Sequence, residues 1–234
     1  MTYLELVNYL IRRVGIAGSH QDITTVTGHT GRLQLAIDWV REAELDIQRK
    51  WNDWTFHNVE AEIAVPANSH FIDENTPGFF KDIARINENS IYGRTDTDRS
   101  KLQLLCWADM RDKRGTQESQ FNCSIPREIS IDPSGRFFFW QPSSESWIIN
   151  FTGQTKPLEL VADKQVSLIP PEYHHIIFHK AAMKYAIYEE AEYLRATHEQ
   201  EYMMLLQQLE SVALPMGDRT NLSSDETPVV VQVM

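Results

Sequence analysis

The feature that most constrains this fold is a long stretch, residues 172–214, that contains neither glycine nor proline. Pro171 precedes this stretch, and proline suits the first position of a helix because the backbone N–H that it lacks would have no partner there. At about 1.5 Å per residue, one unbroken helix of this length would span roughly 60 Å, which is long for a small domain. The sequence therefore predicts a long helical segment with a bend or break near 196–199.

Two further helices are predicted in the first quarter of the chain. Residues 3–14 carry apolar side chains at three- and four-residue spacing, which is typical of an amphipathic helix. Residues 32–54 repeat the pattern, with Thr30 as the expected N-cap, and end in a cluster that includes Trp51 and Trp54. Large aromatic side chains bury a great deal of surface, so this cluster is expected in a core.

Between the helical regions the period of the apolar residues changes to that of strands. Residues 59–65 alternate apolar and polar side chains, which predicts a half-buried strand, and shorter strands are expected near 82–86 and 90–92. An Asp-Pro-Ser-Gly turn at 132–135 separates two apolar runs. Together with the run that follows, it predicts an antiparallel three-stranded meander over 127–152.

These patterns predict an α+β protein with a helical core, an inserted antiparallel β region and an extended C-terminal tail. The expected parts are an N-terminal helical part of the core at 1–58, a mostly β insertion at 59–169, a long helical segment completing the core at 170–214, and a tail at 215–234.

The expected tail combines a polar linker with a run of β-branched residues. After Pro215 the sequence is rich in Asp, Ser and Thr, and it then reaches Val229, Val230, Val231 and Val233. A single strand cannot satisfy its own backbone hydrogen-bonding groups. We therefore expect this run to add to the edge of a sheet in another subunit or partner, or alternatively to a sheet of its own chain.

Charge and cysteine content restrict the partners and the compartment. The net charge is -11, which disfavours general nucleic-acid binding, because affinity for nucleic acid depends largely on cations that neutralise phosphates. An acidic surface could let DNA slide past without sticking, or could simply keep the protein in solution. Cys106 and Cys123 lie in no CxxC motif, so two reduced thiols and a reducing compartment are expected. No apolar run is long enough for a membrane span.

The search for chemistry finds one pattern that could bind a metal. His174, His175 and His179 form a His-His-x-x-x-His run, and the last two share one face of the predicted helix. Zinc needs further ligands and a supporting hydrogen-bond shell, and no HExxH motif supplies them. The alternative is that these histidines pack on a helix. No phosphate-binding loop, dinucleotide fingerprint or nucleophile elbow is present, so neither an enzyme nor a cofactor is expected.

Several short motifs occur along the chain in a specific order. They are Met1-Thr2-Tyr3-Leu4-Glu5-Leu6-Val7-Asn8, Thr24-Thr25-Val26-Thr27-Gly28-His29-Thr30-Gly31, Ile37-Asp38-Trp39-Val40, Asp46-Ile47-Gln48, Trp54-Thr55-Phe56, Gly135-Arg136-Phe137-Phe138-Phe139-Trp140-Gln141-Pro142, Leu160-Val161-Ala162-Asp163 and Ile169-Pro170-Pro171-Glu172-Tyr173-His174. In this order they resemble the head-to-tail adaptor (connector) proteins of tailed bacteriophages. The resemblance covers roughly residues 1–212 and is least over 95–126.

The resemblance implies a structural virion protein that forms a ring, usually of twelve subunits, below the portal. Such a ring extends the DNA channel and joins the phage head to the tail. The implied partners are the portal ring, neighbouring adaptor subunits, a downstream tail or nozzle protein, and genomic DNA that passes through the lumen without sequence-specific binding. The implied location is the head-tail interface of the virion, after assembly in the host bacterial cytoplasm.

The resemblance also suggests roles for particular residues. The tail is expected to reach into the portal, with Val229, Val230, Val231 and Val233 as anchors. His174 falls at the start of the family's long helix, which implies packing and not catalysis. Core or subunit-interface positions are expected for Trp39, Trp51, Trp54, His174 and Ile177, with helix 32–54 and the early part of helix 172–212 lining subunit contacts.

Two other functions compete with the adaptor. A tail terminator or tail-tube protein would assemble with itself in the absence of a portal. A metal-dependent enzyme would use His175 and His179 and would contain bound metal.

Overall fold

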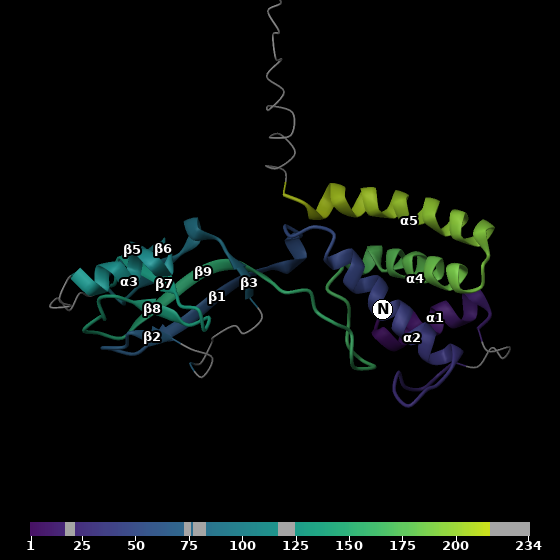
Figure 1. Ribbon diagram of the computed structural model, residues 1–234, viewed down its shortest axis with the longest axis horizontal. Coiled ribbons are helices and arrows are strands. Elements are labelled where there is room, and N and C mark those ends of the chain that lie inside the picture. Colours follow the sequence, from purple (N-terminus) through teal and green to yellow (C-terminus); the bar gives the residue numbers. More distant parts are fainter. Residues whose placement is uncertain (17–21, 73–75, 77–82, 117–124, 216–234) are drawn as a thin grey trace, which may run out of the picture. The chain divides into compact units, whose positions relative to one another are not determined.

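The computed structural model describes every residue except 17–21, 73–75, 77–82, 117–124 and 216–234 (Figure 1). Its contacts divide the chain into two compact units, which are described separately below. The helical unit consists of Met1–His57 and Pro157–Met234, and the β unit consists of Asn58–Lys156. The structure confirms the predicted α+β class, with helices at both ends of the chain and sheets between them.

The helical unit is built from four α-helices and two short 3-10 turns among its described residues. In chain order these are α1 Tyr3–Val14, α2 Arg32–Gln48, η1 Thr55–His57, η3 Pro171–Tyr173, α4 His175–Tyr188 and α5 Glu192–Ala213. Figure 1 shows α4 between α5 and the α1–α2 pair. The buried face of each helix contributes to one apolar cluster. Leu160 and Ile169, which lie in the loop before η3, also belong to this cluster.

Local sequence explains both ends of α1. The Thr2 hydroxyl accepts a hydrogen bond from the Glu5 backbone N–H, and the Glu5 carboxylate accepts one from the Thr2 N–H, which together form a capping box. Gly15 ends the helix with a φ of 71°, a left-handed conformation that costs glycine little.

Helix α2 differs from its prediction at both ends. Its N-cap is Gly31, which has no side chain to cap the helix, so the expectation of Thr30 was wrong. The helix ends at Gln48 and not near residue 54. The physical reason is that the chain turns back after Arg49, and the Trp54 indole N–H donates to the Ile47 carbonyl at 3.1 Å. The Ile47 carbonyl also accepts from the Lys50 N–H at 3.2 Å, so these two donors satisfy a carbonyl that the end of the helix leaves without an intrahelical partner.

The predicted break in the C-terminal helical segment exists but lies earlier than 196–199. Helix α4 ends at Tyr188, and Glu190 adopts a φ of 55°. The Ala191 N–H then donates to the Ala186 carbonyl at 2.8 Å, and the Glu190 N–H donates to the Ile187 carbonyl at 3.2 Å. These two bonds are those of a Schellman motif, which ends one helix and redirects the chain. As a result α5 folds back along α4.

The β unit contains nine strands and one α-helix among its described residues. They are β1 Asn58–Val65, β2 Phe71–Ile72, β3 Ile83–Ile86, β4 Tyr92–Arg94, β5 Arg99–Lys101, β6 Gln103–Leu105, α3 Trp107–Thr116, β7 Glu128–Ile131, β8 Phe137–Phe139 and β9 Trp147–Thr155. One sheet has the order β1-β9-β4-β5, with β3 also pairing with β9, and the other has the order β2-β8-β7-β6.

The predicted meander over 127–152 is correct for two strands and wrong for the third. Strands β7 and β8 pair antiparallel around the predicted turn, but β9 pairs with β1, β3 and β4 in the other sheet. Aromatic residues of both sheets pack together: Phe137 contacts Phe151, and Phe139 contacts Trp147, at ring-centroid distances of 5.5 and 5.0 Å. The packing of these rings between the two sheets stabilises β9 in the sheet with β1 instead of beside β8.

The β region is also not wholly antiparallel. Strand β6 pairs with β7 in the parallel direction, which the sequence did not predict. The two strands are joined by a long connection that contains α3, and a crossover of that kind is what parallel neighbours require.

Candidate assembly surfaces

Four of the five core or interface residues named from sequence lie inside the helical unit. Trp54, His174 and Ile177 are fully buried, and Trp39 is almost so. The Trp39 ring packs against Tyr185 of α4 at a centroid distance of 5.9 Å, so it joins α2 to α4. These side chains hold the unit together and contribute little to its described surface.

His174 makes a buried hydrogen-bonding bridge. Its Nε2 donates to the Ile169 carbonyl at 2.8 Å, and its Nδ1 accepts from the Met1 amino group at 2.6 Å. Burial lowers the pKa of His174, and the neighbouring amino group acts in the same direction. A neutral ring suits both bonds, so His174 positions the start of α4 against the chain's first residue.

Trp51 is the exception among the five, because its side chain is 44% exposed. Its indole N–H donates to Glu210 of α5 at 2.8 Å, and Lys50 forms an ion pair with the same carboxylate at 3.2 Å. Trp51 therefore fixes the end of α5 while leaving one side of its ring at the surface. The predicted portal anchors Val229, Val230, Val231 and Val233 lie outside the described residues.

The structure separates the two histidines proposed for a metal site. His175 lies edge-on to Tyr9, at a centroid distance of 5.4 Å. His179 instead approaches His198 of α5, with their Nδ1 atoms 3.1 Å apart. The described residues contain no group of three or more side chains that could hold a metal ion.

The His179–His198 contact is a hydrogen bond between helices α4 and α5. One Nδ1 donates and the other accepts, which requires the accepting ring to be neutral, so the bond is lost when both rings are protonated. Burial lowers the pKa of both side chains. The neighbouring His198 and His175 rings lower the pKa of His179 further, whereas the Glu201 carboxylate opposes the shift of both His179 and His198. His198 was missed from sequence because only the α4–α5 turn brings it beside His179.

An exposed stripe runs along α5 on the side away from its buried residues. We define the α5 stripe as Leu194, Thr197, Glu201, Met204, Gln208 and Val212, which recur at three- and four-residue spacing and so share one side of the helix. All six are exposed, and Leu194, Met204 and Val212 are large apolar side chains in water. Among the charged residues that the structure describes between 193 and 212, Glu201 is exposed, whereas Arg195 and Glu199 form an ion pair with each other and Glu210 pairs with Lys50.

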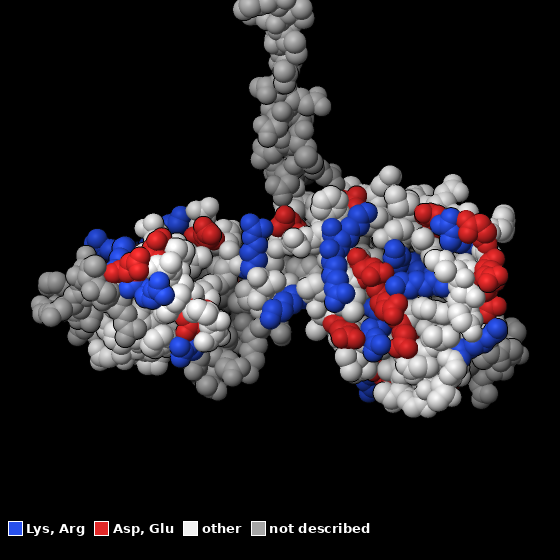
Figure 2. All heavy atoms as spheres, viewed as in Figure 1, with Lys and Arg blue, Asp and Glu red and all other residues white. Residues whose placement is uncertain are grey.

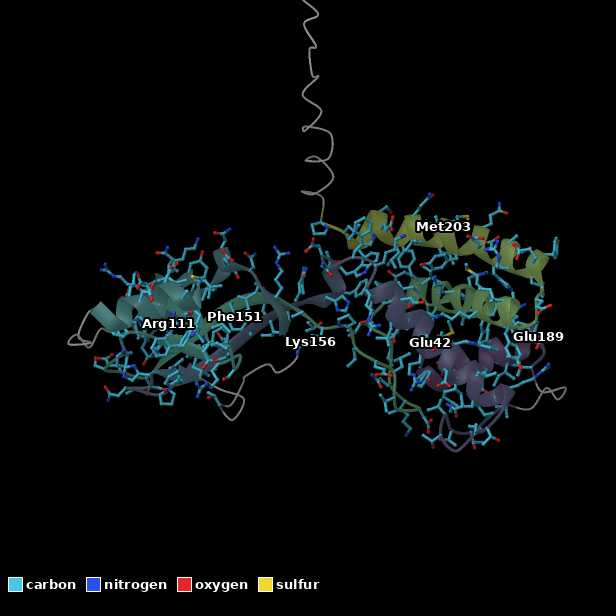
Figure 3. The ribbon with its side chains drawn as sticks, in the orientation of Figure 1. Glu42, Arg111, Phe151, Lys156, Glu189 and Met203 are labelled. Carbon is cyan, nitrogen blue, oxygen red and sulfur yellow. The ribbon has the colours of Figure 1, made fainter. Side chains whose placement is uncertain are left out.

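Other apolar side chains of α4 and α5 are exposed outside this stripe. Met203, also on α5, and Ile187 and Tyr188 at the end of α4 are all exposed. Figure 3 labels Met203 on α5 and Glu189 at the turn between the two helices. In the last turn of α5 the structure buries Ala213 and exposes Val212.

A second exposed apolar surface belongs to the loop that leads into α4. Leu158, Val161 and Val166 are 43%, 66% and 51% exposed. Hydrogen bonds hold the loop in place, since the Gln48 side chain binds the backbone of Leu158 and the Tyr3 N–H donates to the Gln165 carbonyl. We call residues 158–166 the loop segment.

The two units carry different charges. The helical unit has 19 acidic and 11 basic residues, a net charge of -8, whereas the β unit has 14 acidic and 11 basic residues, a net charge of -3. On the face shown in Figure 2, acidic and basic side chains of the described residues are interspersed on each unit. Within the described residues, no helix combines the length and apolar character that crossing a bilayer requires.

Comparison with known proteins assigns the family. The family model of the SU10 adaptor protein matches residues 1–231, which is nearly the whole chain. No curated protein matches the sequence. The match confirms the resemblance to phage head-to-tail adaptors and implies a structural protein and not an enzyme. This chain belongs to the SU10 adaptor protein family, a family of phage head-to-tail adaptors.

Proposed function

We propose that this protein forms a ring below the phage portal, extends the DNA channel and joins the head to the tail. The observation that carries the proposal is the family match, which covers residues 1–231 and so includes both units and most of the tail. The proposed partners are the portal, neighbouring copies of this chain and a downstream tail or nozzle protein. DNA passes through the lumen without sequence-specific binding, and no cofactor takes part.

The charge of the chain supports a channel role. A net charge of -11, most of it on the helical unit, repels phosphates at close range. A DNA-binding protein would instead need clustered cations, because affinity for the backbone depends on the release of counterions. An acidic ring would therefore let the genome move past without holding it.

The sequence of the tail supports portal binding. Val229, Val230, Val231 and Val233 form a β-branched run that follows a polar linker rich in Asp, Ser and Thr. Such a run can add to the edge of a sheet in a partner. A ring would present many copies of it at once, and the resulting avidity would make a weak single contact strong.

The test is a portal-binding assay that compares the full chain with a chain ending at Asn221. Negative-stain imaging and sedimentation should show the full chain as a ring on the portal and the shortened chain unbound. A variant with Val229, Val230, Val231 and Val233 changed to Ser should behave like the truncation.

The matched control changes four linker residues, Thr220, Ser223, Ser224 and Thr227, to Ala. This variant alters the same number of tail residues without touching the valines, so it should bind like the full chain. The proposal fails if the full chain does not bind the portal. Growth of the free chain into tubes would point instead to a tail-tube protein.

A further inference from the structure

The first half of α5 is attached to α4 mainly through His179 and His198, which we call the histidine pair. Helix α5 runs along α4 (Figure 1), but no side chain of residues 192–201 is buried. Within the described parts of the chain, His198 is the only side chain of 192–201 that hydrogen-bonds to a residue of another element or packs its ring against one. The attachment of this half therefore depends on one titratable contact.

The second half of α5 is fixed in a different way. Its buried side chains, Tyr202, Leu206, Leu209 and Ala213, belong to the apolar cluster of the helical unit. Near its end, Glu210 accepts a hydrogen bond from the Trp51 indole N–H and pairs with Lys50. Segments with few buried contacts open first, so loss of the histidine contact should release 192–201 and leave the second half in place.

The contact depends on how many protons the histidine pair holds. The two Nδ1 atoms are 3.1 Å apart. With no added proton, or with one, one ring can donate and the other can accept. With both rings protonated, each Nδ1 carries a hydrogen and neither can accept. Two positive charges then lie close together in a half-buried position, where water screens them less than at an exposed one. The second proton therefore forces the rings apart.

The surroundings of the pair favour the neutral rings. The buried Phe178 ring lies against both, at centroid distances of 5.0 Å from His179 and 5.5 Å from His198. Burial lowers the pKa of both histidines, so the closed pair holds fewer protons than the open pair. The closed arrangement is therefore most stable above the ordinary histidine pKa of 6.5 and loses stability as the pH falls below that value.

The charged neighbours do not replace the lost contact. His175, one turn earlier on α4, lowers the pKa of His179, whereas Glu201 raises the pKa of both histidines. Glu201 is exposed, so water screens its attraction for a protonated ring. Other titratable groups on the packed helices are engaged elsewhere: Lys180 lies over the Tyr202 ring, Lys184 pairs with Glu42 and Asp46 of α2, Arg195 pairs with Glu192 and Glu199, and Arg13 of α1 lies over the Tyr9 ring.

We propose that the histidine pair is a pH-sensitive switch, which holds residues 192–201 on α4 while one ring is neutral and releases them when both rings are protonated. Release uncovers one side of Phe178, which is 6% exposed in the closed arrangement. The switch belongs to the helical unit of a single chain, and it goes beyond the proposed ring and portal contact.

Hydrogen exchange of the backbone amides in the full chain tests the release. The protection factors of amides 196–201, relative to those of 203–213, should fall at least about tenfold between a pH of about 7.5 and a pH of about 5. The reason is that each proton excluded from the closed pair costs a factor of about ten for every pH unit below the ordinary pKa. The second half of α5 serves as the internal reference.

Two variants connect the release to the pair. His198→Gln keeps a side chain that can hydrogen-bond to His179 but takes up no proton in this pH range, so acid should no longer release 196–201. His175→Gln is the matched control, because it removes a histidine one turn from His179 that lies outside the pair. This control should still show the acid release.

An NMR titration of the histidine rings measures the protons directly. At a pH of about 7.5, one ring of the pair should hold its proton on Nδ1 and the other on Nε2, because one donates and the other accepts. The second proton should bind only below the ordinary pKa of 6.5, together with the loss of protection in 196–201.

Equal protection of 196–201 at both pH values would overturn the proposal. A release that persists in His198→Gln would also overturn it, as would simultaneous loss of protection along the whole of α5. His179→Gln is the reciprocal variant and should also abolish the acid release, and helical circular dichroism at neutral pH shows whether each variant is folded. None of these measurements involves the portal, so their outcome is separate from the test of the proposed function.

Discussion

At the scale of single residues, the Glu44 carboxyl is the polar group with the least support in the helical core. It is fully buried, and its two oxygens have no hydrogen-bond partner of normal geometry among the described residues. Burial raises the pKa of Glu44 to about 7, although Ser167, Gln48 and the Leu168 backbone lie near enough to oppose the shift. A carboxyl that loses its proton in such a place destabilises the native state.

Glu44→Gln should therefore stabilise the protein in a pH-dependent way. The native pKa is raised, so the native state holds its proton to higher pH than the unfolded chain, and the stability of the unchanged protein falls as pH rises from the unfolded value of 4.5 to about 7. Relative to the unchanged protein, the variant should gain about 3 kcal/mol across this window. Urea unfolding at several pH values, followed by helical circular dichroism, measures the gain.

The control for this prediction is Glu60→Gln, which removes the same charge from an exposed position of β1. Glu42 is unsuitable because its carboxylate pairs with Lys184 of α4 at 2.9 Å. If Glu60→Gln gives an equal gain, then general charge repulsion is the cause and the burial of Glu44 is not.

At the scale of elements, the turn between α4 and α5 decides how the C-terminal segment packs. The Schellman motif at its centre needs a left-handed residue, and the chain places Glu190 there with a φ of 55°. A residue with a Cβ is strained in this conformation, which glycine adopts readily. The turn also brings His198 of α5 beside His179 of α4, where their Nδ1 atoms are 3.1 Å apart.

Two glycine substitutions locate the break. Glu190→Gly should raise the free energy of unfolding by about 0.5–1 kcal/mol because it relieves the strained conformation. Ala196→Gly should lower it by about 1 kcal/mol, because position 196 lies inside α5, where glycine is unfavourable. Thermal or urea unfolding measures the change in free energy of unfolding for each variant. If the helix instead broke at 196–199, Glu190→Gly would destabilise the protein and Ala196→Gly would not.

At the scale of the whole molecule, the β unit is inserted into the helical unit through two neighbouring connections. Strand β1 begins the insertion and β9 ends it, and these strands pair antiparallel with Asn58 opposite Gln154. Residues paired in this way have Cα atoms about 5 Å apart. The helical core meanwhile draws its apolar residues from both sides of the insertion and needs none from inside it.

Removal of residues 58–156 should therefore leave a folded helical unit. A Gly-Ser linker of about four residues can span the gap, because the two connections start beside each other. The shortened chain should keep its helical circular dichroism and unfold cooperatively. Loss of cooperative unfolding, with binding of a dye for exposed apolar surface, would show that the helical unit depends on the β unit.

Much of this fold could be predicted from local periodicity. The capped apolar stripe of α1, the alternation of β1 and the turn between β7 and β8 are each recorded in a few consecutive residues. The order of motifs also indicated the adaptor family, which the match over residues 1–231 confirmed. The tail anchors stay a prediction, because they lie outside the described residues.

The sequence by itself determined which side of α1 and of β1 is buried, and the tertiary structure alone decided what each buried side packs against. Periodicity is a local property, so it could not show that β9 joins β1, that β6 runs parallel to β7, or that His198 meets His179. The exposed α5 stripe also could not be identified from the sequence. A helix has several sides, and only packing on α4 shows which sides of α5 remain exposed.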